Sequence, residues 1–301
     1  MSERTARYPG VYAAMATPLT PDGKVDRDGV GRLVNALLDA GIDGLSILGS
    51  TGECNGLTRA QRQEVLATVM EAAGGRGTIF TGAAGTVVDD IVADLKAADG
   101  SGAVGALVPP PFYFPLNTAA VIDYFQYVAE ASPIPIILYN IPRLTKVPIA
   151  VEAVARLAEH PNIIGIKDSS GDFGYFTAVV RAVANHPDFT VLTGSDNLLA
   201  SALFAGGDGI IGATVNVVPE AEAGIFKAMR EGDFATAQSL QGLVAAVTDA
   251  CRIGVFPAAF KAALALKGIC GPHMTRPIPA LTDEETAELR SRLVALGVIE
   301  A

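Results

Sequence analysis

Short apolar runs alternate along the chain with longer segments whose hydrophobic residues recur at helical spacing. Runs rich in Val, Ile, Leu and Gly predict eight β-strands, at Tyr12 to Thr17, Gly44 to Leu48, Thr78 to Gly82, Ala103 to Val108, Ile134 to Tyr139, Ile163 to Lys167, Thr190 to Thr193, and Gly209 to Ala213. Helices are predicted between the strands, among them Asp28 to Ala40, Arg59 to Ala73, Thr118 to Ala131, Val151 to Glu159, and Tyr175 to Asn185. Eight parallel strands joined by crossover helices close into a barrel, so the sequence predicts an α/β fold, a (β/α)8 TIM barrel.

After the eighth run the pattern changes, because helical spacing continues without intervening strands. Consecutive helices are predicted at Pro219 to Met229, Phe234 to Ala250, Pro257 to Lys267, and Asp283 to Leu296. We therefore expect residues 1–217 to form the barrel core and residues 218–301 to form a C-terminal helical extension.

Composition and charge narrow the classes of partner. The net charge of −10 disfavours a nucleic-acid partner. The chain has neither a run of about 18 apolar residues nor a basic-then-apolar leader, which predicts no membrane contact and a cytoplasmic location. Cys54, Cys251 and Cys270 lie far apart and the histidines are isolated, so we expect reduced structural cysteines and no metal ion.

Unusual residues stand at the ends of several predicted strands, which is where the chemistry of a (β/α)8 barrel lies. They are Gly49 to Glu53 after the second strand, Pro109 to Tyr113 after the fourth, Tyr139 to Pro142 at the fifth, and Lys167 to Gly171 at the sixth. No Gly-rich phosphate loop is present, which disfavours a nucleotide. A small-molecule substrate is expected at this end of the barrel.

Lys167 ends an apolar run, so its side chain is expected to point either into the barrel mouth or into the helix layer. Both places are largely dry, and lost solvation disfavours the ammonium form. We expect a lowered pKa and an amine that attacks a carbonyl group. The alternative is a structural ion pair with Asp168 or another carboxylate.

The segment Gly49 to Glu53 fits a small carboxylate. It offers the hydroxyl groups of Ser50 and Thr51, and its glycines leave backbone N–H groups open to close approach. The alternative is a capped turn before the next helix.

Tyr139 stands one strand away from Lys167 and is a candidate proton relay. Thr51 and Tyr113 would extend a chain of hydroxyl groups from it. The alternative for Tyr139 is a core tyrosine whose hydroxyl group bonds a backbone carbonyl. For Asn140 and Pro142, the alternative to a role in the site is that they only shape the turn after the strand.

Taken together, these residues resemble the family of dihydrodipicolinate synthases and N-acetylneuraminate lyases, which are pyruvate-dependent class I aldolases. The resemblance runs from about Gly10 to Leu296 and rests on three motifs of the chain: GSTGE at 49–53, YNIP at 139–142, and IGIKD at 164–168. It implies a Schiff base between pyruvate, or another 2-oxo acid, and the enzyme, without a metal or cofactor.

The resemblance also implies residue roles. Lys167 would form the Schiff base, Tyr139 would relay protons, and Ser50 with Thr51 would bind the pyruvate carboxylate. Tyr113 matches a tyrosine that reaches the site of a neighbouring subunit, which implies an obligate oligomer, typically a homotetramer. The residues that fall where the family lines its pocket are Gly194, Asp196, and Ile211.

The second substrate is predicted from departures within the family. Dihydrodipicolinate synthases follow YNxP with one residue, then Arg, then Thr, and that Arg holds the carboxylate of aspartate semialdehyde. Here Leu144 stands at the Arg position, and Arg143 comes one residue early. On an extended segment this shift points Arg143 to the opposite side. Leu at this position is similar to the N-acetylneuraminate lyase and 2-keto-3-deoxy-sugar-acid aldolase branches of the family. This resemblance favours an aldolase for a 2-keto-3-deoxy sugar acid or 4-hydroxy-2-oxo acid.

Three alternatives remain open. One is a dihydrodipicolinate synthase, which condenses pyruvate with aspartate semialdehyde. Another is a dehydratase or hydratase that uses the same imine chemistry. The third belongs to a different class, a non-catalytic 2-oxo-acid sensor, because a fold alone does not fix function.

Overall fold

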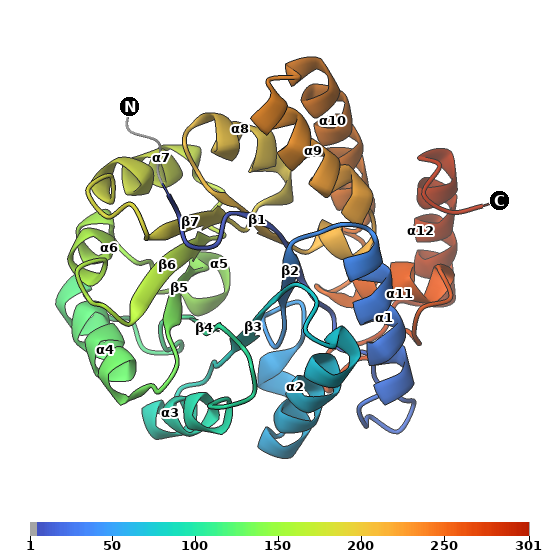
Figure 1. Ribbon diagram of the computed structural model, residues 1–301. Helices are drawn as coiled ribbons and strands as arrows, with labels where there is room; N and C mark the ends of the chain where they lie inside the picture. Colours follow the sequence, from blue (N-terminus) through green and yellow to red (C-terminus); the bar gives the residue numbers. More distant parts are fainter. Residues whose placement is uncertain (1–4, 301) are drawn as a thin grey trace.

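A computed structural model gives the structure of the protein and describes residues 5–300. Eight parallel strands form a closed barrel in which each strand pairs with its neighbours in chain order and β8 pairs with β1 (Figure 1). The prediction of a TIM barrel is confirmed. The strands are β1 (Gly10–Ala14), β2 (Gly44–Ser46), β3 (Thr78–Gly82), β4 (Gly105–Val108), β5 (Ile136–Asn140), β6 (Ile163–Asp168), β7 (Thr190–Thr193), and β8 (Gly209–Gly212).

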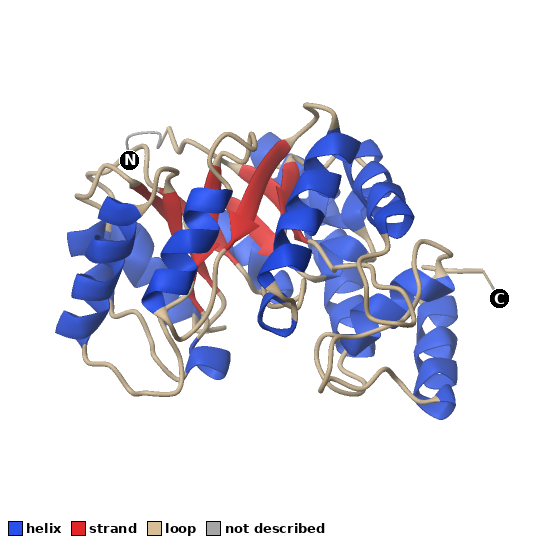
Figure 2. Ribbon diagram, turned by 90° about the horizontal axis from the view of Figure 1, so that it is seen from below, coloured by secondary structure: helices blue, strands red, loops and turns tan. Residues whose placement is uncertain are grey.

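Helices surround the barrel, as Figures 1 and 2 show from two directions. The helices before β8 are α1 (Arg27–Asp39), α2 (Arg59–Ala73), α3 (Val88–Ala97), α4 (Thr118–Ala131), α5 (Pro142–Thr145), α6 (Val151–Leu157), α7 (Phe173–Ala182), and α8 (Leu199–Phe204). Short 3-10 turns follow three strands: η1 (Cys54–Gly56), η2 (Asp196–Leu198), and η3 (Thr214–Asn216).

The helix starts follow local capping chemistry. Asp26 accepts a hydrogen bond from the backbone N–H of Gly29 at the start of α1. Thr58 and Gln61 form a reciprocal capping box at the start of α2, and this helix has the predicted bounds. Side-chain caps of this kind satisfy backbone donors that the first helical turn leaves free.

Up to residue 300, the regular elements that follow β8 are helical, as predicted: after the turn η3 come α9 (Pro219–Glu231), α10 (Phe234–Ala250), α11 (Ala258–Leu266), and α12 (Asp283–Ala295). The α9 helix packs against β1 and α8 as well as α10. The α11 and α12 helices lie together outside α1 (Figure 1). The boundary after residue 217 stays a prediction.

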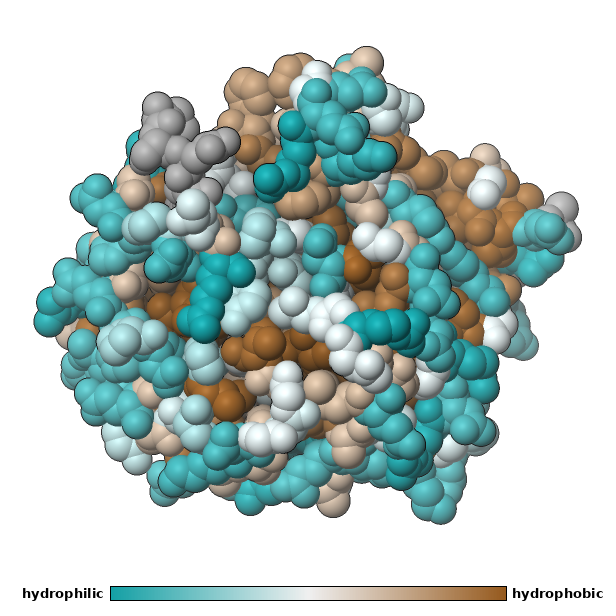
Figure 3. Space-filling view, viewed as in Figure 1, coloured by the Kyte–Doolittle hydropathy of each residue, from teal (hydrophilic) through white to brown (hydrophobic). Residues whose placement is uncertain are grey.

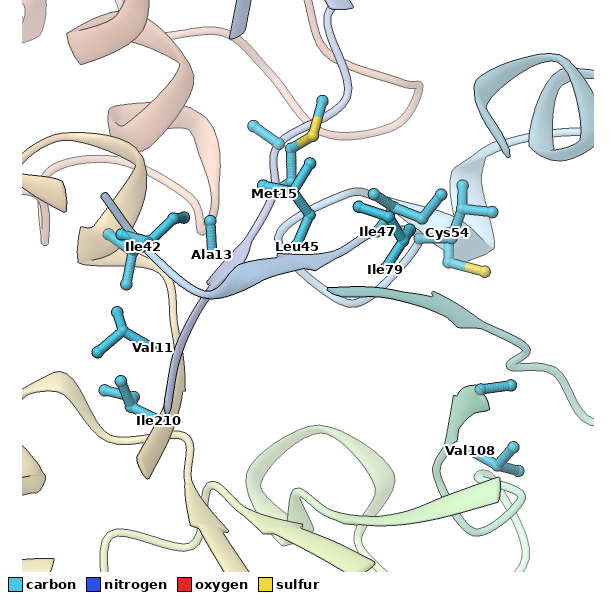
Figure 4. Packing of buried hydrophobic residues seen from close by; sticks show 14 of the residues in the cluster. Val11, Ala13, Met15, Ile42, Leu45, Ile47, Cys54, Ile79, Val108 and Ile210 are labelled. Carbon is cyan, nitrogen blue, oxygen red and sulfur yellow. The ribbon is translucent and has the colours of Figure 1, made fainter. Parts of the chain in front are cut away.

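Alternation along the strands sorts the buried apolar side chains into two clusters. The outward cluster fills the layer between strands and helices, and Figure 4 shows Val11, Ala13 and Leu45 of this cluster around β1 and β2. The inward cluster fills the barrel and includes Tyr12 and Phe80, whose rings meet edge to face at 5.2 Å. On the face seen in Figure 3, apolar side chains at the centre are ringed by hydrophilic ones.

Within residues 5–300, the helices are too short or too polar for any of them to cross a lipid bilayer. Cys54, Cys251 and Cys270 are buried free thiols, as expected.

Candidate active site

A register shift in β6 sets the direction of Lys167. Opposite β5, Ile136 pairs with Ile163, but Ile137 pairs with Gly165, so β6 carries one extra residue at Ile164. Ile164 belongs to the inward cluster, and strict alternation from it would turn Lys167 outward. The extra residue reverses the alternation, as a β-bulge does. Lys167 therefore pairs beside Tyr139 and points into the barrel mouth.

Lys167, Tyr139 and Ser50 form a chain of polar groups at this mouth. The Lys167 side chain is buried, with Nζ 3.5 Å from the Tyr139 hydroxyl oxygen and 4.5 Å from the centre of its ring. The same hydroxyl oxygen lies 3.5 Å from Ser50 Oγ. Three strand ends thus bring an amine and two hydroxyl groups together.

Lys167 opens into a cavity of about 570 Å³, which we call the lysine cavity. Its lining includes most of the residues that the sequence singled out: Lys167, Tyr139, Thr51, Gly194, Asp196, and Ile211. Ser50 lines an adjoining pocket of about 300 Å³, and Tyr139, Ile141 and Phe256 contribute to both spaces. The second pocket is mainly apolar and includes Leu144.

The carboxylate of Asp168 has other partners than the neighbouring lysine. It accepts hydrogen bonds from Asn140 Nδ2 at 2.8 Å and from the Ser170 backbone N–H at 3.0 Å and hydroxyl group at 2.9 Å. Asn140 in turn accepts a bond from the Ile149 N–H at 3.0 Å. Asn140 and Asp168 therefore brace the ends of β5 and β6, while Lys167 faces the cavity.

The loop that carries Ser50 and Thr51 is fastened by Glu53. This buried glutamate forms an ion pair with Lys261 of α11, and both the N–H and the hydroxyl group of Thr275 donate to it, at 2.6 and 2.8 Å. Lys261 also donates to the His273 carbonyl oxygen at 2.7 Å. Burial lowers the pKa of Lys261, and the nearby Glu53 opposes that shift. The C-terminal helices thus hold the loop after β2 in place.

Asp196 lines the lysine cavity beside Gly194 and Ser195, at the end of β7. Its Oδ1 accepts a hydrogen bond from the Thr214 N–H at 2.8 Å, which ties the end of β7 to the end of β8. Burial raises the pKa of Asp196, and hydrogen bonds together with the charge of Lys167 partly oppose this.

Tyr113 is the predicted site residue that the structure does not bring into the lysine cavity of its own chain. Its side chain is 84% exposed and its backbone is left-handed, with φ at 89°. Its ring packs edge to face on Phe114, which is also largely exposed. This exposure agrees with the expectation from the family resemblance that Tyr113 reaches out of its own subunit, whereas the expectation that it extends the hydroxyl chain from Tyr139 is not met within one chain.

The expected direction of Arg143 is wrong. Residues Pro142–Thr145 form the short helix α5 and not an extended segment, so a shift of one residue turns a side chain by about 100° and not by half a turn. Arg143 lines the lysine cavity and stacks over the Phe256 ring at 5.3 Å, whereas Leu144 lines the apolar pocket. The lining also includes Ser169, from the strand-end segment Lys167 to Gly171, and two hydroxylated residues that sequence reasoning missed, Ser195 and Thr248.

Gly194 lies so close to Lys167 that a larger residue would not fit at this position. A Cβ atom at this position would lie 2.6 Å from Lys167 Cε and 2.0 Å from Ser169 Oγ. We expect Gly194→Ala to lower kcat/KM by about 10²-fold, the effect of misplacing a reacting group by about 1 Å. Steady-state kinetics measures this. Gly31→Ala is the control, because that helical glycine has no atom within 4 Å of the added Cβ; equal activity of the two variants would contradict the argument.

Residues 5–300 contain no group of three or more His, Cys, Asp or Glu side chains arranged to hold a metal ion.

Comparison with known proteins gives matches over nearly the whole chain. The model of the dihydrodipicolinate synthetase family matches residues 7–296. An uncharacterized DapA-like lyase of Halobacterium salinarum is 34% identical over 290 residues, which span 96% of this chain and 94% of that protein. A 4-hydroxy-tetrahydrodipicolinate synthase of Gluconobacter oxydans is 34% identical over 296 residues, 98% of this chain and 99% of that protein.

A solved structure agrees with the sequence matches. YagE from E. coli K12, a prophage protein of the dihydrodipicolinic acid synthase family in complex with pyruvate, superposes with a TM-score of 0.93 at 31% identity, covering 97% of this chain and 100% of that one. The resemblance drawn from the three strand-end motifs is confirmed. The chain belongs to the dihydrodipicolinate synthetase family, a family of lyases.

Proposed function

We propose that this protein is a pyruvate-dependent lyase that forms a Schiff base through Lys167 and makes or breaks a carbon–carbon bond in a 2-oxo acid. The observation that supports it is the buried chain of Lys167 Nζ, Tyr139 OH and Ser50 Oγ, joined by two 3.5 Å contacts beside a substrate-sized cavity. An amine, a proton relay and a carboxylate site are the three parts that imine chemistry needs.

The steps follow from this arrangement. The neutral amine of Lys167 attacks the 2-oxo carbon, and Tyr139 passes a proton to the carbonyl oxygen to give a carbinolamine. Loss of water gives the protonated imine, which accepts electrons from the adjacent bond. In retro-aldol cleavage the C4 hydroxyl group loses its proton, and the C3–C4 bond breaks to release an aldehyde while its electron pair moves toward the imine and leaves an enamine. In the reverse direction the enamine attacks the aldehyde carbonyl carbon, whose oxygen takes up a proton.

Ser50 and Thr51 would hold the carboxylate of the 2-oxo acid. Thr51 is buried in the lining of the lysine cavity, and Ser50 already contacts Tyr139. A carboxylate bound there would place its 2-oxo carbon between Tyr139 and Lys167. This positioning converts the attack into a reaction within one complex, which contributes strongly to the rate.

A hydroxylated aldehyde suits the remainder of the lysine cavity. Beyond Lys167 the lining carries Asp196, Ser195 and Thr248, which bond hydroxyl groups. This supports cleavage or formation of a 2-keto-3-deoxy sugar acid or related 4-hydroxy-2-oxo acid.

A second candidate is condensation of pyruvate with aspartate semialdehyde. Arg143 favours it, because its guanidinium group lines the lysine cavity and suits the second carboxylate of that substrate. The synthase of Gluconobacter oxydans carries the corresponding name.

Tyr113 supports a proposal about assembly. Since it is exposed and lies outside the lysine cavity of its own chain, it can complete a hydroxyl chain only in the site of another copy. We propose a homotetramer in which Tyr113 serves a neighbouring site. Sedimentation of the wild type and Tyr113→Ala, with activity at matched concentrations, tests this; a fully active monomer would rule it out.

Trapping tests the imine. Incubation with pyruvate and borohydride is expected to add one reduced pyruvyl group at Lys167, located by peptide mass spectrometry. Borohydride without pyruvate is the control. Unmodified Lys167 at saturating pyruvate would contradict the proposal.

A panel of aldehydes with pyruvate, together with 2-keto-3-deoxy acids alone, separates the substrate candidates. Faster turnover of hydroxyaldehydes than of aspartate semialdehyde is expected. The reverse order would favour the synthase. Pyruvate binding without any turnover would favour a sensor.

A further inference from the structure

Glu222 of α9 is a buried acid that the proposed mechanism does not use. Its side chain is 0% exposed, and neither carboxyl oxygen accepts a hydrogen bond from an N–H or hydroxyl donor of the described residues. The α9 helix packs against β1, η3, α8 and α10, so water is kept from this position. An ionised carboxylate without a donor would be costly here.

The polar group that interacts with Glu222 is the carboxyl group of Asp196. Two carboxyl groups form a hydrogen bond only when one of them carries a proton, because an ionised carboxylate is an acceptor alone. Burial first, and then Asp196, raise the pKa of Glu222 well above its ordinary value. Asp196 already accepts the Thr214 N–H, whereas Glu222 has no such donor among the described residues, so the ionised form is better stabilised at Asp196 and the proton of the pair is assigned to Glu222.

Asp196 links this proton to the lysine cavity. It lines the cavity, and it already accepts a bond from the Thr214 N–H at 2.8 Å. The titratable groups that interact with the pair are Lys167 from β6 and Cys251 after α10. Burial and the Asp196 charge raise the pKa of the Cys251 thiol to about 12, so the thiol stays neutral.

We infer that Glu222 is a protonated positioning residue, whose hydrogen bond to Asp196 holds that carboxylate as the acceptor for a hydroxyl group on the part of the substrate beyond the pyruvyl unit. The inference rests on the proposed function, because it assigns Asp196 to the second half of a 2-oxo acid bound at Lys167. Glu222 itself touches no substrate.

Substitutions that keep or remove the donor separate positioning from packing. Glu222→Gln retains an N–H donor for Asp196, whereas Glu222→Met has similar length and no donor. 2-Keto-3-deoxygluconate should compete with pyruvate for Lys167. We expect the concentration of this sugar acid that halves pyruvate trapping to be about tenfold higher for E222M than for the wild type, which is the effect of losing a bond to a charged group. E222Q should stay within about twofold of the wild type. The exposed Glu220→Gln on the same helix is the control.

The pH profile gives a readout that loss of packing would not change. In the wild type, competition by 2-keto-3-deoxygluconate should weaken at alkaline pH, when the shared proton leaves and two buried charges repel each other. E222Q has no such proton, so this alkaline loss should disappear. Its difference infrared spectrum against the wild type at neutral pH should show the carbonyl stretch of one protonated carboxyl group.

The proposed function and the role of Glu222 are contradicted by different results. The pyruvate concentration for half-maximal trapping, measured without the sugar acid, should be the same in E222M, E222Q and the wild type. If the wild type does not trap pyruvate at all, the proposed function is refuted, while the infrared band still reports on Glu222. Absence of that band, or equal competition curves for the wild type and E222M, overturns the inference.

Discussion

Replacing Lys167 with arginine is expected to abolish turnover, with a loss in kcat on the order of 10⁴-fold or more, as for loss of a covalent nucleophile. Arginine keeps the positive charge and similar length, but its guanidinium group stays protonated at any working pH and does not attack a carbonyl group. The buried Lys167 amine, 3.5 Å from the Tyr139 hydroxyl group, has no substitute among the residues that line the lysine cavity.

Kinetics and trapping should be measured on the same samples. Lys167→Arg should give no pyruvyl adduct, while Lys227→Arg, an exposed position on α9, should react like the wild type. Unchanged circular dichroism would show that the arginine variant folds. A reduced pyruvyl group on another lysine, with turnover retained, would mean that the imine forms elsewhere.

The barrel could be predicted because its strands are short apolar runs between amphipathic helices. The runs Thr78–Gly82 and Thr190–Thr193 match the structure, since turn residues bound them on both sides. The first strand differs: it was expected at Tyr12 to Thr17 but spans Gly10–Ala14. Residues 15–17 are buried without strand geometry, and an apolar pattern records burial, not backbone pairing.

The sequence predicted which residue types form the site, but it predicted less well in which direction their side chains point. Strand periodicity alone left Lys167 either inside or outside the barrel, and the extra residue at Ile164 decides between them. The error over Arg143 has the same origin, because its direction depends on whether the segment after Pro142 is helical or extended. Local backbone geometry of one or two residues determines both.

Glu222 lay outside what the sequence could indicate. It belongs to an amphipathic helix that carries other acidic residues, and such a pattern is typical of a side chain exposed to solvent. Its burial arises from the packing of α9 against β1, η3, α8 and α10, and its partner Asp196 is 26 positions earlier in the chain. Contacts of this kind depend on how elements meet, which periodicity within one element does not specify.

Replacing Lys261 with methionine is expected to reduce the free energy of unfolding by about 3–5 kcal/mol, the usual cost of removing one partner of a buried ion pair. Glu53 would keep the two bonds from Thr275 but lose its cation in a site with almost no exposure. The loop after β2 carries Ser50, so the pyruvate concentration for half-maximal trapping should rise as well.

Urea unfolding at equal protein concentrations measures the loss, and two variants control for it. Arg156→Met breaks the exposed Arg156–Glu159 pair and should change stability by less than about 1 kcal/mol. The double variant Lys261→Met with Glu53→Gln removes the charge that the single variant leaves unpaired, so it should be more stable than Lys261→Met alone. If the double variant is no more stable, the cost lies in lost packing of α11 and not in an unpaired Glu53 charge.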